Sequence, residues 1–314
     1  MTTNQPLSVV IGASGGIGSA VARELAAQGK RVRAVNRSGK ADLPASVEIV
    51  RGDALDAASL REACREASVV FNCANVPYPE WETKFPPMMQ NITAAASAAN
   101  AKLIFADNLY MYGPVTGTIT EDLPYAAPGH KGKLRARLAT ELLDAHRAGK
   151  VRVAIGRASD FYGPGVMNAL AGKDLFGAVI AGKKAMWAGS LDAPHTLTFI
   201  EDFARGLIVL AERDEALGQV WHIPGAEPIT GREFLRIAFQ AAGTSPQMGA
   251  YSPLMIRLVG LFSPMVREVN ETMYQFVAPF IVGGEKFARA FGGIATPHHK
   301  AIPQTVAWYQ RATP

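Results

Sequence analysis

The sequence predicts an α/β protein built on a doubly wound parallel sheet. In the first half of the chain, short runs rich in β-branched residues alternate with alanine-rich stretches of helical periodicity. A glycine-rich turn joins the first run to the first helical stretch. The 314 residues, 48% of them hydrophobic, supply enough material for a large core. We therefore predict a sheet-forming domain at residues 1–160 and a smaller, mainly helical portion at 161–314 that is interleaved with the sheet.

The predicted elements follow from the spacing of apolar residues. Strands are expected at 7–11, 31–35, 47–50, 69–71, 103–106 and 151–155, and helices at 17–28, 59–67, 88–100 and 133–148. Two later helices are expected at 231–242 and 253–262. Because helical crossovers make such strands parallel, a ligand is expected at their carboxyl ends.

Composition excludes several classes of protein. No apolar run reaches the roughly 18 residues that span a bilayer, and the first six residues lack the pattern of a signal peptide. Two cysteines, Cys64 and Cys73, are too few for a disulfide framework or a metal cluster. The net charge of +5 comes from scattered Lys and Arg residues. We expect a cytoplasmic protein with a small-molecule substrate and without a metal, membrane or nucleic-acid partner.

The glycine-rich turn predicts a dinucleotide site. Gly12 permits a tight turn, Gly15 lets the backbone approach a phosphate, and Gly18 lets helix and strand pack closely. The intervening Ser14, Gly16 and Ile17 complete the predicted phosphate loop. The free N–H groups and the positive dipole end of the following helix would face the pyrophosphate. The alternative is a glycine-rich turn without a ligand, but the order of strand, turn and helix favours a Rossmann-type nucleotide site.

The end of the second strand predicts which cofactor binds. Proteins that bind NAD usually place an acidic residue there for the ribose 2′-hydroxyl. This chain instead has Asn36, Arg37 and Ser38, and the next acidic residue is Asp42. An arginine can hold a 2′-phosphate by two parallel hydrogen bonds, and Asn36 and Ser38 add neutral donors. These residues favour NADP(H) over NAD(H), unless Arg37 is merely a solvated loop residue.

With these residues in place, the chain resembles the extended, epimerase/dehydratase-like branch of the short-chain dehydrogenase/reductase superfamily. The glycines at 12, 15 and 18 match its spacing, and the segments 51–56, 72–75, 112–113, 160–165 and 199–204 match further signatures. The resemblance implies that Asp53, beside Ala54, contacts the adenine and that Cys73, Ala74 and Asn75 lie near the nicotinamide ribose. It also implies that Asn91 bridges toward the active site, and that the protein forms a homodimer.

The chain departs from this family at the catalytic residues. The family places Tyr-x-x-x-Lys on a helix, so that the lysine lowers the pKa of the proton-transferring tyrosine. Here Lys133 keeps the lysine position, whereas Gly129 stands where the tyrosine would be. Asn108 replaces the usual serine or threonine that holds the substrate oxygen.

Other residues could supply the proton. Tyr110 is the predicted proton donor, with aromatic packing as the alternative, and Tyr125 is a second candidate. His130 could act as an acid near neutral pH or be a surface residue, and Lys131 could be a solvated neighbour or a site residue.

The substrate is less well indicated. Family members that bind nucleotide sugars carry an arginine before the late acidic pair, but residues 193–198 contain none. The tail is rich in Met, Phe and Tyr, which suits either an apolar pocket or a helical core (Tyr251, Met255, Phe262, Met265, Met273, Tyr274, Phe276, Phe280).

Three functions remain open. The first is an NADP(H)-dependent reductase or dehydrogenase of a small, apolar carbonyl or related substrate, in which Lys133 orients the ribose and Asn108 holds the substrate oxygen. The second is an NAD(P)-dependent epimerase or dehydratase of a sugar-type substrate. The third is a catalytically silent regulator that senses NADP(H) and acts through partner proteins.

Overall fold

The computed structural model describes residues 5–262, 268 and 270–312. Residues 1–4 of the stretch inspected for a signal peptide, and Met265 of the apolar tail, lie outside the described residues. The chain divides into two compact units, each built from several separate segments. Unit 1 is formed by Met1–Asn108, Leu134–Arg157 and Ala204–Ile223, and unit 2 by Leu109–Lys133, Ala158–Phe203 and Pro224–Pro314. The single domain boundary expected at residue 160 stays a prediction.

A seven-stranded parallel sheet forms the centre of unit 1 and confirms the predicted fold class. Its strand order is β12-β7-β5-β4-β1-β2-β3. The strands are β1 (Leu7–Ile11), β2 (Arg31–Asn36), β3 (Glu48–Arg51), β4 (Ala67–Asn72), β5 (Lys102–Asp107), β7 (Arg152–Arg157) and β12 (Val220–His222). The chain runs outward from β1 to β3 and then returns to β4 on the other side of β1. The carboxyl ends of β1 and β4 therefore form the switch point where such sheets bind ligands.

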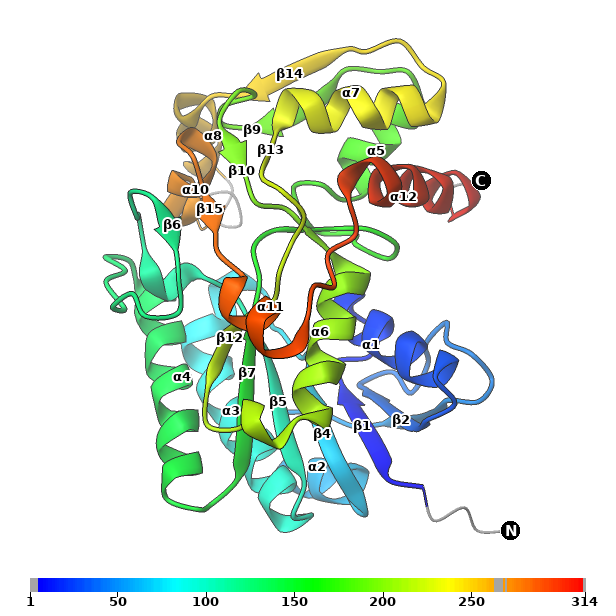
Figure 1. Cartoon of the computed structure of the whole chain (residues 1–314), viewed down its shortest axis with the longest axis vertical. Coiled ribbons are helices and arrows are strands. Elements are labelled where there is room, and N and C mark those ends of the chain that lie inside the picture. The colour runs from blue at the N-terminus through cyan, green and yellow to red at the C-terminus, as the bar shows by residue number, and fades with distance from the viewer. Residues whose placement is uncertain (1–4, 263–267, 269, 313–314) are drawn as a thin grey trace. The chain divides into compact units, whose positions relative to one another are not determined.

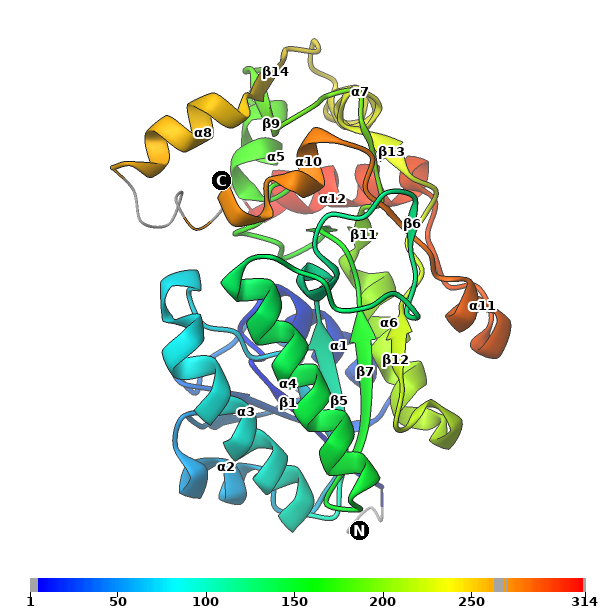
Figure 2. The same ribbon diagram turned by 90° about the vertical axis from the view of Figure 1, so that its left-hand side faces the viewer.

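Helices cover both faces of this sheet (Figures 1 and 2). On one face lie α1 (Gly16–Ala27) and α6 (Ile200–Glu212), and on the other α2 (Ala57–Ala63), α3 (Trp81–Ala98) and α4 (His130–Arg147). The 3-10 helices η1 (Tyr78–Glu80) and η3 (Asp214–Ala216) complete unit 1. The first turns of α4 and α6 belong to unit 2. Each helix turns an apolar side to the sheet, which is the arrangement that buries both sheet faces.

Helices α2, α3 and α4 have other bounds than the sequence predicts, and α6 was not predicted. α4 begins at His130 rather than at 133. α2 ends at Ala63 rather than at 67, because Glu66 adopts a positive φ of 65° and β4 begins directly after it. α3 begins at Trp81 rather than at 88, although Pro86 and Pro87 lie inside it. Its first turns bury large apolar side chains, among them Trp81, and this burial outweighs the backbone hydrogen bonds that the prolines remove.

Unit 2 combines helices with short strands that pair two by two. The pairs are β10 (Pro194–His195) with β13 (Ile229–Thr230), β11 (Thr198–Phe199) with β8 (Phe161–Tyr162), β14 (Met248–Tyr251) with β9 (Ala185–Ala188), and β15 (Ile281–Val282) with β6 (Thr118–Ile119). The helices are α5 (Lys173–Ile180), α7 (Gly231–Ala242), α8 (Pro253–Gly260), α10 (Tyr274–Val277), α11 (Glu285–Phe291) and α12 (His298–Ala312), with the 3-10 helices η2 (Tyr110–Tyr112) and η4 (Asn270–Thr272). The helix expected at 231–242 is confirmed as α7, and the one expected at 253–262 ends at Gly260.

Aromatic side chains build much of the core of unit 2. The rings of Phe176 and Tyr309 stack at 5.0 Å, and the ring of Phe234 meets Tyr162 edge to face at 5.2 Å. The buried Tyr162 hydroxyl donates to His298 Nδ1 at 2.8 Å, while His298 Nε2 lies 3.0 Å from the Glu227 carbonyl oxygen and donates to it. Because burial disfavours the charged ring, it lowers the pKa of His298, and the Glu227 hydrogen bond offsets this only in part.

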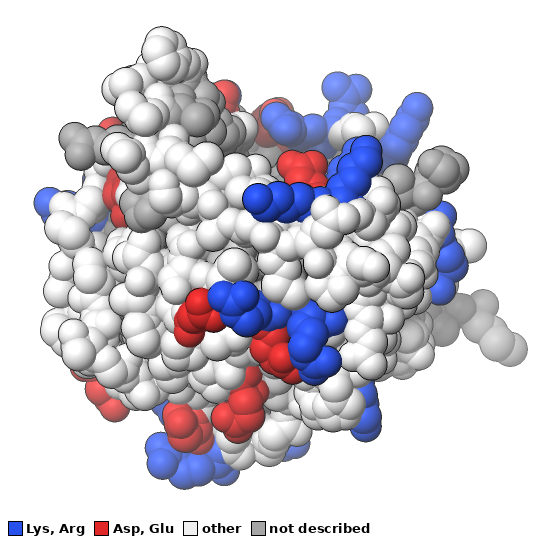
Figure 3. Space-filling model, turned by 90° about the horizontal axis from the view of Figure 1, so that it is seen from above, with Lys and Arg blue, Asp and Glu red and all other residues white. Residues whose placement is uncertain are grey.

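None of the helices within residues 5–262, 268 and 270–312 is long and apolar enough to cross a membrane. On the face shown in Figure 3, basic and acidic side chains are interspersed, and uncharged residues make up most of the surface. The expected lack of membrane and nucleic-acid partners stays a prediction.

Candidate functional site

The glycine turn after β1 is held by close backbone packing within unit 1. Gly12 adopts a φ of +83°, and a Cβ at this position would lie 2.7 Å from the backbone of Cys73 and Ala74. At Gly18, a Cβ would lie 2.8 Å from the Gly12 carbonyl carbon. At Gly15, by contrast, a Cβ would meet only the Gly12 oxygen, at 3.4 Å. The turn is therefore closed on the side of the sheet and open at Gly15, as a site for a phosphate requires.

The first turn of α1 faces this opening. Gly15 is its N-cap residue, and none of the described side chains hydrogen-bonds to the cap. Ser14 and Gly15 are exposed, and Gly16 and Ile17 are half-buried. Since the first N–H groups of a helix have no partner within it, they are available to an anion. The predicted phosphate loop is thus chemically suited to a pyrophosphate.

The loop after β2 uses two of its three predicted site residues to hold itself together. Asn36 Oδ1 accepts from Gly39 N at 2.8 Å and from Ser38 Oγ at 2.9 Å, and its Nδ2 donates to Lys40 O at 3.1 Å. These bonds occupy the groups that the sequence assigns to a 2′-phosphate. Arg37 is exposed, and within the described residues its guanidinium makes no ion pair. The contact with a 2′-phosphate would therefore depend on Arg37.

The segment after β3 lies beside the same loop. Gly52 N donates to Asn36 O at 2.9 Å, which places Asp53 next to the end of β2. The Asp53 carboxylate accepts from Leu55 N at 3.0 Å, and the residue is exposed. Asn91 of α3 donates to Ala54 O at 3.2 Å and so ties this segment to the helix. Asp53, Ala54 and Asn91 are therefore brought together, with the Asn91 amide directed to Ala54.

The end of β4 completes this side of the site. The buried Asn72 accepts from Ala74 N at 3.1 Å through Oδ1 and fixes the turn against Gly12. Asn75 is exposed, and its Oδ1 accepts from Val76 N at 2.9 Å. Burial raises the pKa of the Cys73 thiol to about 12, so this side chain stays neutral. The predicted segments from four strands thus meet at the carboxyl edge of the sheet.

A buried ion triad that the sequence analysis missed lies at the ends of β5 and β7. The Asp107 carboxylate accepts from Arg135 Nη2 at 2.6 Å and from Arg157 Nε at 2.9 Å. The Arg135 guanidinium also packs over three aromatic rings (Trp81, Phe85 and Phe105), at 4.7–5.2 Å from their centroids. Asp107 directly precedes Asn108, the predicted holder of the substrate oxygen. The sequence does show an acidic residue, Asp107, at the carboxyl end of a predicted strand. Its two arginine partners come from distant segments, however, so the sequence does not indicate the triad.

The predicted residues of unit 2 lie around η2 and the first turn of α4. Tyr110 is half-buried, and a Cβ at Gly132 would lie 2.5 Å from its carbonyl oxygen. Tyr125 lies at the surface, with its ring edge to face against Tyr112 at 5.8 Å. Lys133 is exposed, and its ammonium group makes no ion pair within the described part of the chain.

A cluster of charged side chains surrounds the position of the missing tyrosine. A Cβ at Gly129 would overlap the carboxylate of Glu271 and lie 2.6 Å from its Cγ. Glu271 Oε1 accepts from Lys131 N at 2.8 Å, and Oε2 lies 2.9 Å from His130 Nδ1 and 3.4 Å from Lys131 Nζ. Lys131 also pairs with Glu268. Lys131 is therefore a buried residue, 1% exposed, and not a solvated neighbour.

Electrostatics mark this cluster as strongly coupled. Burial raises the pKa of the Glu268 carboxyl, but Lys131 and His130 together outweigh it, so that this pKa lies below its usual value. Burial and the negative charges of Asp160 and Glu271 raise the pKa of Tyr274. Sequence analysis could not find Glu268 and Glu271, because they lie about 140 residues from Lys131 along the chain.

A buried histidine, His195, lies in the segment 193–198, which contains no arginine. His195 Nδ1 donates to the Gln275 carbonyl at 3.1 Å, and Nε2 lies 3.0 Å from Asp160 Oδ2 and 3.3 Å from Ser159 Oγ. Its ring stacks between Phe276 and Phe280. Thus two of the aromatic tail residues pack on this histidine, whereas Tyr251, Met255 and Phe262 are exposed.

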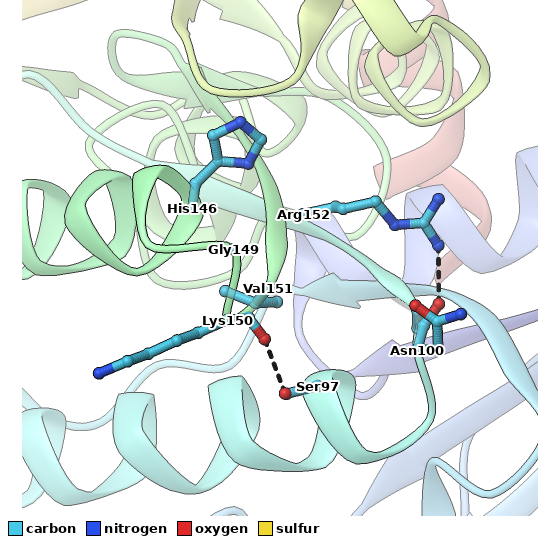
Figure 4. A pocket seen from close by; sticks show the side chains of 8 residues that line it. Ser97, Asn100, His146, Gly149, Lys150, Val151 and Arg152 are labelled. Atoms are coloured by element: carbon cyan, nitrogen blue, oxygen red, sulfur yellow. Dashed lines mark hydrogen bonds between the residues drawn. The ribbon is translucent and has the colours of Figure 1, made fainter.

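The cavities described in unit 1 lie elsewhere. One of about 260 Å³ is lined by residues from the ends of α3 and α4 and from the start of β7. Figure 4 shows Ser97 Oγ donating to Lys150 O and Arg152 donating to Asn100 O, each at 2.7 Å. Since Lys102 and Arg152 begin β5 and β7, this cavity lies at the amino ends of the strands. It is therefore remote from the glycine turn.

Comparison with known proteins identifies the family. The model of the NAD dependent epimerase/dehydratase family matches residues 8–223. The chain therefore belongs to that family, which confirms the resemblance drawn from its motifs. Among curated proteins, none matches the sequence.

Several solved structures share the fold over nearly the whole chain. MoeE5 in complex with UDP-glucose and NAD is 21% identical, with coverage of 98% of this chain and 100% of that chain and a TM-score of 0.77. UDP-glucuronic acid 4-epimerase from Bacillus cereus, in complex with NAD, is 16% identical, with the same coverage and a TM-score of 0.80. UDP-glucose 4-epimerase from Thermus thermophilus, also with NAD, is 18% identical, with the same coverage and a TM-score of 0.78. At these identities the similarity shows the fold.

Proposed function

We propose that this chain is a nicotinamide-dependent enzyme of the epimerase/dehydratase type, which oxidises a secondary hydroxyl of its substrate and reduces the product again within one turnover. The family match over residues 8–223 carries this proposal. It takes precedence over the net reductase that the sequence favours. When bound, the nicotinamide would supply the acceptor and donor of the hydride.

The predicted cofactor-binding residues, all of them in unit 1 except Lys133, suit the cofactor that this proposal requires. The open position at Gly15 and the first turn of α1 would hold the pyrophosphate, and Asp53 the adenosine end. Cys73, Ala74 and Asn75 would lie along the nicotinamide ribose, and Lys133 would hydrogen-bond to it. Asn108 would hold the substrate oxygen.

Within this function, Arg37 favours NADP(H) over NAD(H), although the similar structures named above contain NAD. The test is a paired titration with NADPH and NADH of the wild type and of Arg37→Gln. If Arg37 binds the 2′-phosphate, the variant loses about tenfold in NADPH affinity, the equivalent of about 1.4 kcal/mol, and nothing in NADH affinity. Arg31→Gln, at the other end of β2, is the matched control. Equal affinity of the wild type for both cofactors would contradict the preference.

One measurement can distinguish the possible substrate classes. UDP-glucose and UDP-glucuronic acid, which the similar structures bind, are compared with secondary alcohols and carbonyls that lack a diphosphate. An epimerase or dehydratase converts its substrate without a lasting change in nicotinamide absorbance, whereas a reductase consumes the cofactor in equal amounts. The lack of an arginine in residues 193–198 favours substrates without a diphosphate. Cofactor binding without any conversion would instead support a silent regulator.

The proposed homodimer would form through α3 and α4. A groove of about 560 Å³ runs between these helices and is lined mainly by apolar and small side chains, including Met89, Ala94 and Leu142. Ala94→Arg would place a charge in this groove and is expected to give a monomer in light-scattering measurements. Ala98→Arg, one turn further along α3 and outside the groove lining, is the control.

A further inference from the structure

Gly129 stands where the family has its tyrosine, and the space beside it is occupied by another side chain. The three heavy atoms nearest to a Cβ at Gly129 all belong to the carboxylate end of Glu271. Any residue larger than glycine would displace this carboxylate from the first turn of α4. The glycine at position 129 is therefore what allows the Glu271 carboxylate to lie here.

The contacts of Glu271 hold its carboxylate in a defined orientation. Oε1 accepts from Lys131 N at 2.8 Å, and Oε2 faces both His130 Nδ1, at 2.9 Å, and Lys131 Nζ, at 3.4 Å. The carboxylate remains 19% exposed, and the His130 side chain is 52% exposed. A carboxylate and an imidazole that touch each other and reach solvent can exchange protons with a bound molecule.

We propose that Glu271, supported by His130 and Lys131, is the proton-transferring residue that replaces the family's tyrosine. This inference rests on the proposed function. When the substrate is oxidised, its O–H bond would break and the proton would form an O–H bond on Glu271, while a bound nicotinamide would accept the hydrogen of the neighbouring carbon with its electron pair. The reverse transfers restore the hydroxyl, so that protons and electrons balance.

The surroundings of Glu271 fit this role. Lys131 is the buried cation that lies beside the proton-transferring group, as the lysine lies beside the tyrosine in the family motif. Glu268 also contacts both Lys131 and His130, so that the two carboxylates share these partners. Tyr274 lies in the neighbouring helix α10, and, in addition to burial, the negative charges of Asp160 and Glu271 both raise its pKa. Proton loss from the cluster is therefore expected to involve several coupled groups.

The central test compares Glu271→Gln with the wild type on whichever substrate of the panel is converted. Glu271→Gln keeps the shape of the side chain but cannot accept the proton, so kcat is expected to fall about 10²- to 10⁴-fold. Cofactor affinity should stay unchanged, because Glu271 is not among the residues that would hold the cofactor. In Glu271→Gly, added formate should restore part of the activity. Glu233→Gln is the matched control, because Glu233 also lies in the first turn of a helix beside a cation, Arg236.

A second measurement needs no substrate. Gly129→Ala should lower Tm in the wild type but much less in Glu271→Gly, because the atoms that a Cβ meets are gone. Gly177→Ala, where a Cβ meets nothing within 4 Å, is the control. An equal loss of Tm in both backgrounds would overturn the arrangement.

The outcomes separate the inference from the proposed function. Conversion by the wild type, with kcat unchanged in Glu271→Gln, overturns the inference and leaves the function standing. Lost activity in Tyr110→Phe with full activity in Glu271→Gln assigns the proton to Tyr110 instead. A wild type that converts no member of the panel contradicts the proposed function and, with it, catalysis by Glu271.

Discussion

Replacing Asp107 by asparagine should destabilise unit 1 strongly. The carboxylate lies between the guanidinium groups of Arg135 and Arg157, and all three side chains are at most 5% exposed. A neutral amide at this position would remove the negative charge that pairs with both buried guanidinium groups. Breaking a buried ion pair in this way costs about 3–5 kcal/mol. For a chain of this length that corresponds to a fall in Tm of about 5–8 °C.

Two variants make this reasoning testable by thermal denaturation monitored by circular dichroism. Arg135→Met removes one cation and leaves the remaining pair balanced, so it should lower Tm less than Asp107→Asn does. Asp214→Asn removes an exposed ion pair with Lys102 and should change Tm little. If Asp107→Asn is no less stable than Asp214→Asn, the triad does not stabilise the fold as argued.

Three further predictions concern single positions. Gly12→Ala should lose both stability and cofactor binding, because a Cβ meets backbone at 2.7 Å, whereas Gly29→Ala, at a similar φ in open space, should bind cofactor normally in a fluorescence titration. Because burial lowers the pKa of His298, the unfolded state takes up its proton first, and stability in urea should fall as the pH drops below about 6.5. His298→Gln should flatten this dependence and His299→Gln should not. Burial raises the pKa of Cys64 to about 11, so its thiol should react with a thiol reagent at pH 8 only after unfolding; rapid labelling of the folded protein would contradict this.

The sheet of unit 1 was predictable because its signals are local. Apolar runs located six of the seven strands within one or two residues, although β12 was not predicted, and the glycine turn marked the crossing point of β1 and β4. The start of α3 was not predictable in this way. By sequence rules, Pro86 and Pro87 indicate a helix boundary. The helix nevertheless begins at Trp81, because this side chain is buried in the tertiary structure.

The nucleotide half of the site was more accessible to sequence analysis than the chemical half. Gly12, Asp53 and Ala74 are found because short motifs place them at strand ends. The partners of Lys131 lie in a segment about 140 residues away, and no local sequence pattern predicts these contacts. For Asn36, the sequence identifies a residue near the site but not its role. Its side-chain amide forms hydrogen bonds within its own loop.

The interleaving of the two units also governs how the protein can be made. The chain passes from one unit to the other at residues 108, 133, 157, 203 and 223, so neither unit is complete until late in synthesis. The edge strand β12 is synthesised only after the first two segments of unit 2, and α12 follows later still. A nascent or truncated chain that stops at residue 160 would leave β7 as an unpaired edge and the α6 side of the sheet uncovered. Both units can therefore close their cores only after α12 (His298–Ala312) has been synthesised, and not on passage of an internal boundary.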